Sequence, residues 1–564
     1  MPVSLFDYLS FVRKRRSDVS ESYNALPRPD ADASDHGYVY RTWLRMTFSL
    51  PLLQVGKAII FKQRDGWFKI TKTTSKLAAF PIIRTIIVAS PAVSAVTDAS
   101  KEEINSVGQL IERAQQALRQ FKGADQARVD EAVTAVAWSL YKPENAQRLA
   151  EQAVADTGIG NVADKIIKNQ RKTFGTLRDL MRVRTVGIIE PDPGNGMVRY
   201  GKPVGVVAAI TPSTNPAATP VNKTMMALKG ANAIVIAPSP AGWSSTSATV
   251  DLMREALVKV GAPADLVQIL PQPVSRNMTR LLMEQADLII ATGSQNNVRA
   301  AYSSGTPAIG VGAGNVPVII DSSADLDDAA QKIHASKTFD NSTSCSSENS
   351  LVIVDDVYEN AIAALERAGA YRCTAAEKNL IEEKLWVRGN LNRDLIAKDA
   401  DIFAAGIGLA ETAQAARFFL VEEEFDAESK FTDEKLSLVL TVYRARDFDH
   451  AVELVTDILN VQGKGHSCGI HTSDMGQPTR LAEEIDVVRV LVNQAHTFGN
   501  GGSFNNALNF TLSMGCGTWG GNSISENLNY RHFINITHLV KAVGEDKPSE
   551  DDLFGAYFAR YGKD

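Results

Sequence analysis

Near-continuous apolar runs alternate with amphipathic runs between residues 204 and 320, and no other feature of the chain constrains its fold as strongly. Strands that are buried on both faces have such apolar sequences, and the intervening segments have the periodicity of helices. The pattern therefore predicts an α/β fold with a doubly wound parallel sheet, which binds ligands beyond the carboxyl ends of its strands. The expected strands span residues 204–210, 233–237, 266–270, 288–291 and 316–320.

The turn after the first of these strands departs from the usual dinucleotide-binding pattern. It has the sequence Thr-Pro-Ser-Thr-Asn-Pro at residues 211–216 and lacks the Gly-x-Gly-x-x-Gly pattern that lets a backbone approach a pyrophosphate. A dinucleotide that binds at this sheet has to be held by other residues.

The composition is that of a globular protein with more than one domain. The chain has 564 residues, of which 44% are hydrophobic and 22% are charged, and its formal net charge is −6. This length exceeds what one hydrophobic core usually organises. The acidic balance gives no basic field for nucleic acid, so we expect no nucleic-acid partner. Four cysteines without a CxxC pair favour the reducing cytoplasm, and the absence of HExxH or Cys/His clusters predicts no metal site.

The first 100 residues differ from the rest of the chain. They are basic and show no sustained period of 2 or 3.6 residues, and we assign them no role. Residues 78–96 are apolar, but they include Pro81, Arg84 and Pro91 and are barely long enough to span a bilayer. We therefore expect no membrane association.

A helical lead-in precedes the alternating segment. Helical periodicity predicts helices at residues 102–121, 125–140 and 143–156, the last with a proline in its first turn. Two short β-prone runs, 184–189 and 197–200, flank a turn-rich segment, which is typical of a hairpin.

Cys345 stands among small polar residues, just ahead of another apolar run. Small neighbours leave its sulfur accessible. If this serine-rich stretch borders a helix N-terminus, free N–H groups would stabilise the thiolate, which is the nucleophilic form. A lone cysteine is more often a packing residue, so this segment alone leaves both interpretations open.

Several segments, taken together, resemble the CoA-acylating aldehyde dehydrogenases in order and spacing. They are TPSTNP at 211–216, TGS at 292–294, GAGNVP at 312–317, the Cys345 segment at 336–348, EKLS at 434–437, GH at 465–466 and GCGTWGGNS at 515–523. The run 503–516 most resembles the branch that acts on sulfoacetaldehyde.

The resemblance implies an aldehyde dehydrogenase fold, with a cofactor domain, an α/β catalytic domain and a small oligomerisation element. It also implies a cytoplasmic homodimer or homotetramer. The expected divisions are an N-terminal extension at 1–100, the nicotinamide-binding domain at 101–334 with an oligomerisation hairpin near 184–200, the catalytic domain at 335–524, and an oligomerisation strand and tail at 525–564.

The resemblance further implies that Cys345 attacks the aldehyde to form a thiohemiacetal, that its hydride passes to the nicotinamide, and that a thioester remains on the enzyme. Asn215 would complete an oxyanion hole with the Cys345 backbone N–H, where one donor typically contributes ~3 kcal/mol. Without the resemblance, Asn215 would be an ordinary turn residue. His466 would assist proton transfer with CoA, because an imidazole titrates near neutral pH, or would only order its glycine-rich loop.

The cofactor, NADP or NAD, would be held by residues that the resemblance identifies. Glu434 would face the nicotinamide ribose, although a solvated glutamate beside Lys435 is the plain alternative. Ser239 can hydrogen-bond a 2′-phosphate or a 2′-hydroxyl, so the residues leave NAD and NADP open, and the resemblance favours NADP. The implied cofactor-binding residues are Thr211, Pro212, Ser239, Gly293, Ser294, Gly312, Gly314 and Glu434, and those at the mouth of the substrate site are Trp519, Asn522 and Ser523.

Val311 decides the acyl acceptor. Alignment on Pro317 puts Val311 where hydrolytic relatives carry the glutamate that activates water. Valine cannot accept a proton, so the thiol of coenzyme A should react in place of water. The expected reaction converts aldehyde, CoA and NAD(P)+ to acyl-CoA and NAD(P)H. Sulfoacetaldehyde is the expected substrate and sulfoacetyl-CoA the product; acetaldehyde or another short aldehyde, and a hydrolytic dehydrogenase that releases a free acid, are the alternatives.

The substrate side of the sequence offers only neutral donors for a sulfonate. Asn505, Asn506 and Asn509 supply amides, and the pattern of residues indicates no arginine clamp.

Overall fold

The computed structural model describes residues 99–192, 194–312 and 314–563, together with three short strands in the N-terminal extension. The chain forms two compact units, Met1–Val96 and Thr97–Asp564. The apolar stretch 78–96 lies outside the described residues. None of the helices that are described is long and apolar enough to cross a membrane.

The first unit contains a small antiparallel sheet. Its strands pair in the order β1–β2–β3, with hairpin connections between neighbours. Their bounds are β1 (Leu52–Val55), β2 (Ala58–Gln63) and β3 (Gly66–Thr71).

Four helices open the second unit: α4 (Lys101–Phe121), α5 (Gln126–Tyr141), α6 (Pro143–Thr157) and α7 (Val162–Met181). The first three confirm the sequence prediction. Ser100 starts α4 with a capping box to Glu103, and Asp125 caps α5. The fourth helix, α7, is absent from the prediction because much of its buried face is polar, which weakens the apolar period.

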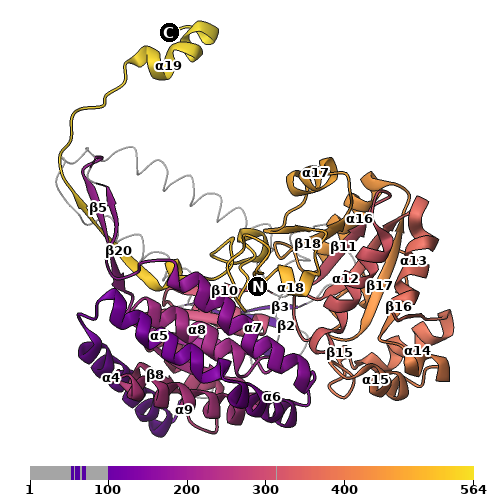
Figure 1. The fold of residues 1–564 in the computed structure, drawn as a ribbon, viewed down its shortest axis with the longest axis horizontal. Coiled ribbons are helices and arrows are strands. Elements are labelled where there is room, and N and C mark those ends of the chain that lie inside the picture. Colours follow the sequence, from indigo (N-terminus) through magenta and orange to yellow (C-terminus); the bar gives the residue numbers. More distant parts are fainter. Residues whose placement is uncertain are drawn as a thin grey trace. The chain divides into compact units, whose positions relative to one another are not determined.

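A five-stranded parallel sheet follows, in the order β10–β9–β6–β7–β8. Every residue of β6 and β7 is buried, because helices cover both faces of the sheet. Helix α5 packs on α8 and α9 (Figure 1), and α4 packs on α10. The elements are β6 (Val206–Thr211), α8 (Ala218–Lys229), β7 (Ala233–Pro238), α9 (Trp243–Lys259), β8 (Val267–Ile269), α10 (Arg276–Gln285), β9 (Leu288–Thr292), α11 (Gln295–Ser303) and β10 (Ala308–Val311).

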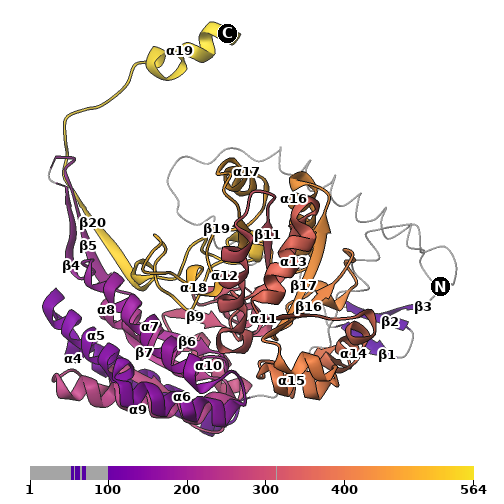
Figure 2. The ribbon, with the colours of Figure 1, turned by 45° about the vertical axis from the view of Figure 1, so that its right-hand side comes forward.

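A second parallel sheet has seven strands in the order β13–β16–β17–β12–β11–β18–β19. Figure 2 shows α12, α13 and α16 beside it. Its strands are β11 (Val316–Ile320), β12 (Glu348–Val354), β13 (Ala370–Arg372), β16 (Phe418–Glu422), β17 (Val439–Ala445), β18 (Cys468–His471) and β19 (Val490–Val492). Its helices are α12 (Leu326–Thr338), α13 (Tyr358–Arg367), α14 (Ala375–Leu385), α15 (Ala400–Ile407), α16 (Phe448–Val461), α17 (Gly476–Glu484) and α18 (His496–Gly499).

The expectation that residues 316–320 continue the first sheet is wrong. Strand β11 pairs with β12 and β18 in the second sheet. A buried parallel strand has the same apolar sequence in either sheet, so periodicity does not tell which neighbour it takes.

The predicted hairpin is confirmed as β4 (Gly187–Asp192) and β5 (Met197–Pro203). The C-terminal strand β20 (Ile534–Val540) pairs antiparallel with β5 and runs alongside it in Figure 1. The chain then ends in helix α19 (Glu550–Tyr561).

Candidate active site

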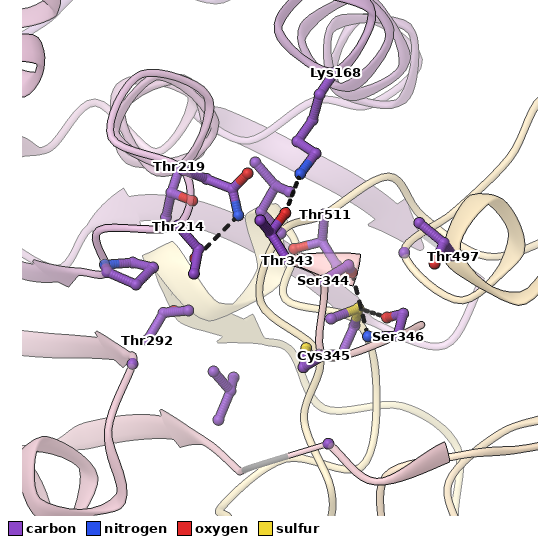
Figure 3. A pocket seen from close by; sticks show the side chains of 18 of the residues that line it. Lys168, Thr214, Thr219, Thr292, Thr343, Ser344, Cys345, Ser346, Thr497 and Thr511 are labelled. Carbon is purple, nitrogen blue, oxygen red and sulfur yellow. Dashed lines mark hydrogen bonds between the residues drawn. The ribbon is translucent and has the colours of Figure 1, made fainter. Parts of the chain in front are cut away.

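A cavity of about 340 Å³ lies at the carboxyl ends of β6, β9 and β10, where a doubly wound sheet is expected to bind ligands (Figure 3). Residues just after these strands line one part of it. The loop that precedes β12 lines another part, and helix α7 with the segment 497–514 lines a third. Elements of both large sheets therefore meet at this cavity.

Cys345 lines the cavity from the loop between the 3-10 helix η4 (Phe339–Ser342) and β12. The condition that its serine-rich stretch borders a helix N-terminus is not met, since a strand follows the loop. Among the described residues, the segment that carries Cys345 does not itself begin a helix whose dipole could stabilise a thiolate.

The surroundings of Cys345 keep its thiol protonated at rest. Burial raises its pKa to about 12, and the carboxylate of Glu434 and the thiol of Cys516 act in the same direction. The guanidinium of Arg489 and a hydrogen bond from Ser346 oppose this shift. The thiol has to lose its proton as the aldehyde reacts, because a resting thiolate is not stabilised.

The loop before Cys345 has an unusual backbone. Asp340, Asn341 and Ser342 have φ angles of 50°, 52° and 63°, a left-handed conformation that side chains other than glycine rarely adopt. The Thr343 hydroxyl donates to the Asp340 carboxylate at 2.7 Å. Strained backbone of this kind persists only where neighbouring contacts hold it, and here it fixes the approach of the chain to Cys345.

Gly314 packs directly against the nucleophile. A Cβ atom placed on Gly314 would lie 2.0 Å from the Cys345 carbonyl oxygen and 2.8 Å from its Cβ. The residue that the sequence assigns to cofactor binding thus also supports the backbone of Cys345.

Gly314→Ala is expected to lower kcat by about 10²-fold, because the added methyl group displaces Cys345 by a distance that disturbs attack geometry. Stopped-flow measurement of the first NAD(P)H formed per active site tests this. Gly312→Ala is the matched variant, since its Cβ would come no closer than 3.2 Å to another heavy atom, the Cys516 sulfur. Equal effects of the two substitutions would contradict the role given to Gly314.

Asn215 lies in the loop after β6 and lines the same cavity. Its Nδ2 donates a long hydrogen bond of 3.3 Å to the Thr214 hydroxyl, and its buried Oδ1 has no partner among the described residues. A buried amide that is weakly bonded within the protein is available to a ligand. This geometry suits the predicted oxyanion-hole role.

The end of the cavity beside the first sheet carries four of the predicted cofactor residues. Pro212 follows β6, Gly293 and Ser294 follow β9, and Gly312 follows β10. Ser294 caps helix α11, whose first N–H groups can bind a phosphate. Thr211 and Ser239, also predicted, do not line the cavity; the Ser239 N–H instead donates to the Thr211 carbonyl at 3.1 Å.

Glu434 also lines the cavity, and burial raises its pKa to about 7. The ammonium groups of Lys435 and Lys337 act against this shift. Glu434 is partly buried where it lines the cavity, which favours the predicted cofactor role over a fully solvated side chain. A carboxyl group with this pKa can accept a proton near neutral pH.

Glu434→Gln is expected to make Cys345 react faster with iodoacetamide at pH 8, although it slows turnover. Removing the carboxylate removes an influence that raises the Cys345 pKa, so more thiolate is present at a given pH. The rate of alkylation against pH measures the change. The exposed Glu424→Gln serves as the control; an unchanged or slower reaction in Glu434→Gln would refute the coupling.

Comparison with known proteins identifies the family. The model of the aldehyde dehydrogenase family matches residues 83–376. The chain belongs to this family. It is 50% identical over 475 residues to the acylating sulfoacetaldehyde dehydrogenase of Cupriavidus necator, covering 84% of this chain and 96% of that protein. The predicted resemblance to acylating aldehyde dehydrogenases is therefore confirmed.

Solved structures agree with the expected fold of an aldehyde dehydrogenase. An acetylating aldehyde dehydrogenase from Geobacillus thermoglucosidasius superposes with a TM-score of 0.76 at 36% identity, covering 79% of this chain and 99% of that one. A propionaldehyde dehydrogenase of Rhodopseudomonas palustris, solved with bound CoA and an acylated cysteine, gives 0.69 at 26% identity, with 77% and 97% covered.

In this aldehyde dehydrogenase, His466 does not line the cavity. It is fully buried, and its Nδ1 lies 2.8 Å from the Ser467 hydroxyl. Burial lowers its pKa well below the usual range, and the positive charge of Arg489 adds to the effect. Burial therefore disfavours the protonated imidazole, which favours the alternative that His466 orders its glycine-rich loop.

The residues predicted at the mouth also lie outside the cavity lining. Asn522 instead connects two loops: its Oδ1 accepts hydrogen bonds from the N–H of Gly312 at 3.0 Å and from the N–H of Cys516 at 2.9 Å. The Ser523 N–H donates to the Tyr302 hydroxyl at 3.0 Å, and Trp519 is half exposed. Asn522 thus positions the loop that carries Gly312, on the cofactor side of the cavity. The resemblance had instead implied that Asn522 lies at the mouth of the substrate site.

The dehydrogenase cavity has a basic side that the sequence analysis missed. Lys168, Arg171 and Lys172 line it from helix α7. Their spacing of three and four residues places Lys168 next to both others on the helix surface. A lysine and arginine stripe without an apolar period normally indicates a solvated face, and only the tertiary fold buries this one.

Proposed function

We propose that this aldehyde dehydrogenase oxidises sulfoacetaldehyde to sulfoacetyl-CoA, with NADP+ or NAD+ as the oxidant and CoA as the acyl acceptor. Val311 carries the choice of CoA over water: it lines the cavity where a hydrolytic relative would carry a carboxylate base. Glu434 is the only carboxylate among the described residues that line this cavity. The C. necator relative, named for acylating oxidation of sulfoacetaldehyde, supports the same reaction and substrate.

The residues at the first sheet fit a nicotinamide dinucleotide, which supplies a hydride acceptor when it is bound. Gly293 leaves open space, since a Cβ placed there would meet no heavy atom within 3.9 Å. Ser294 and the N–H groups that begin α11 can hold a pyrophosphate, and Glu434 can accept hydrogen bonds from a ribose. The chemistry of these donors favours neither NAD nor NADP.

The protein's own residues account for the acyl transfer. Cys345 loses its proton, for which Glu434 is a suitable acceptor, and its sulfur bonds to the aldehyde carbon to give a thiohemiacetal alkoxide. The Asn215 amide and the Cys345 N–H stabilise that oxyanion. Loss of a hydride leaves a Cys345 thioester. The sulfur of CoA then adds to the thioester carbon, and Cys345 departs as a thiolate and regains a proton.

CoA dependence tests this function. Purified protein is mixed with sulfoacetaldehyde, acetaldehyde or propionaldehyde and each nicotinamide cofactor, with and without CoA. We expect about one NAD(P)H per active site without CoA, because the thioester accumulates, and continuous turnover with CoA. Steady formation of free acid without CoA would identify a hydrolytic dehydrogenase. A preference for acetaldehyde would leave the reaction type intact and overturn the assigned substrate.

We also propose that the protein forms a homodimer or homotetramer through the sheet β4–β5–β20. Strand β20 is an edge strand with exposed apolar side chains at Ile536, Leu539 and Val540, and unpaired edges favour association. Light scattering of the full chain and of an Ile536→Lys variant tests the assembly; an unchanged mass in the variant would exclude this edge.

A further inference from the structure

Helix α7 brings an excess of positive charge to the cavity. Lys165 and Lys168 are both buried, and both pair with the single carboxylate of Asp340. Lys172 and Arg171 follow on the same side of the helix and line the cavity. Among the described residues, neither of these two forms an ion pair with a carboxylate. Buried charges are normally paired, so an anion is expected to complete this group.

Lys172 is the more buried of the two, with 9% of its surface exposed. Its Nζ donates to the Gly501 carbonyl at 2.8 Å. Burial, together with the charges of Arg171 and Lys168, lowers its pKa to about 7, whereas the Cys345 thiol acts in the opposite direction. Lys172 and the nucleophile Cys345 line the same cavity.

Arg171 offers a second set of donors. Its Nη2 donates to the Ser503 hydroxyl at 2.9 Å and to the Phe498 carbonyl at 3.3 Å, while its buried Nε has no partner among the described residues. The guanidinium also lies 5.4 Å from the ring centres of Phe498 and Phe504, which hold it in one orientation. A planar group held in this way suits the oxygens of a sulfonate or carboxylate.

This basic side is separate from the part of the cavity that fits the cofactor. Figure 3 shows Lys168 reaching from α7 toward Thr343, whose hydroxyl it contacts at 3.0 Å, while Thr292 at the end of β9 lies well away from it. Because Lys172, Arg171 and Cys345 line one cavity, a short aldehyde bound to Cys345 can extend toward these two basic residues.

We infer that Arg171 and Lys172 bind the anionic group of the substrate, a sulfonate two carbons away from the aldehyde oxygen, and so determine specificity for an anionic aldehyde. This inference rests on the proposed function and adds the residues that select its substrate. A two-carbon aldehyde keeps its charged group close to the attacked carbon, and Lys172 and Arg171 line the same cavity as Cys345. The phosphates of CoA are the other anionic source that the same donors fit.

Substitution of each residue tests the assignment. Arg171→Met and Lys172→Met are compared with wild type for sulfoacetaldehyde and for propionaldehyde, a neutral aldehyde of similar size. We expect the ratio of kcat/KM for sulfoacetaldehyde to that for propionaldehyde to fall about 100-fold, as for loss of a charge-assisted hydrogen bond. Arg182→Met is the matched control, because it removes the same charge from the exposed end of α7.

The outcomes separate the two anionic sources and a purely structural role. A fall in the ratio through the KM of sulfoacetaldehyde supports the inference. Equal losses for both aldehydes, or a rise confined to the KM of CoA, overturn it. If wild type shows no CoA-dependent turnover with any aldehyde, the proposed function fails, and the following measurement still decides whether the anion site exists.

Protection of Cys345 from alkylation by a bound anion can be measured without turnover. Ethanesulfonate is expected to slow alkylation of wild-type Cys345 by iodoacetamide about 10-fold at saturation, whereas the neutral ethanesulfonamide has little effect. Equal protection by the two compounds, or by neither, overturns the inference even if the α7 variants do not fold. Arg182→Met should keep the wild-type pattern.

Discussion

Cys345→Ala is expected to abolish CoA-dependent aldehyde oxidation, with kcat/KM reduced by about 10⁴-fold or more. Without the sulfur no thiohemiacetal or thioester forms, and loss of a covalent nucleophile costs on this scale in enzymes that depend on one. The residues that fit the dinucleotide follow β6, β9 and β10 and do not include Cys345. Binding of NAD(P)+, measured by calorimetry, should therefore stay within severalfold of wild type.

Cys373→Ala provides the control for that experiment. Cys373 is buried beyond the end of β13 and does not line the cavity, so removing its thiol should leave turnover nearly unchanged. Mass spectrometry of the protein incubated with aldehyde and NAD(P)+ but no CoA should show an acyl adduct that disappears in Cys345→Ala. Retained turnover in Cys345→Ala, or an adduct on another cysteine, would remove the covalent mechanism.

Local features of the sequence predicted the elements whose causes are local. The helices predicted at residues 102–121 and 125–140 and the hairpin predicted between residues 184 and 200 each depend on residues a few positions apart, and all three were located correctly. The partner of a parallel strand is not a local property. Strand β11 was therefore expected in the first sheet, although its hydrogen bonds run to β12 and β18.

The residues of the candidate site also divide into those that local motifs predicted and those that depend on distant contacts. Cys345, Asn215 and Val311 belong to recognisable segments and line one cavity, as expected from the resemblance. The sequence did not predict Lys168 as a cavity residue, because its carboxylate partner, Asp340, lies 172 residues further along the chain. A contact of that separation leaves no periodic signal, so a buried basic side appears only once the fold is known. The motif that contains His466 was recognisable, but the burial of its side chain could not be predicted from the sequence.

Asp340 connects the basic side of the cavity to the nucleophile. Its carboxylate accepts the ammonium groups of Lys165 and Lys168, and the same residue begins the left-handed backbone before Cys345. Its N–H also donates to the Asp164 carboxylate at 2.7 Å. Burial alone would raise the Asp340 pKa, but the two lysines outweigh burial and lower it. The ion pairs therefore compensate part of the positive charge of α7 and anchor the strained loop before Cys345.

Asp340→Ala is expected to reduce the free energy of unfolding by about 3–5 kcal/mol, because it leaves two buried ammonium groups without a carboxylate. It should also lower kcat with propionaldehyde, since the strained loop that carries Cys345 loses its anchor. Urea unfolding, followed by tryptophan fluorescence, measures the first effect. The lowered pKa implies that wild type loses this contribution only in acid, as the pH falls through the folded-state value below 3.8.

Asp327→Ala separates burial from charge in this experiment. Asp327 also pairs with a basic residue, Arg367, but 74% of the Asp327 side chain is exposed, and exposed pairs contribute less than about 1 kcal/mol. Asp340→Asn keeps a side chain of nearly the same shape and removes only the charge, so its destabilisation should approach that of Asp340→Ala. If Asp340→Asn is instead as stable as wild type, hydrogen bonding and not charge compensation holds the loop. If Asp340→Ala lowers the free energy of unfolding no more than Asp327→Ala does, the buried ion pair stabilises the protein no more than an exposed one. The loop that positions Cys345 then does not depend on that pair.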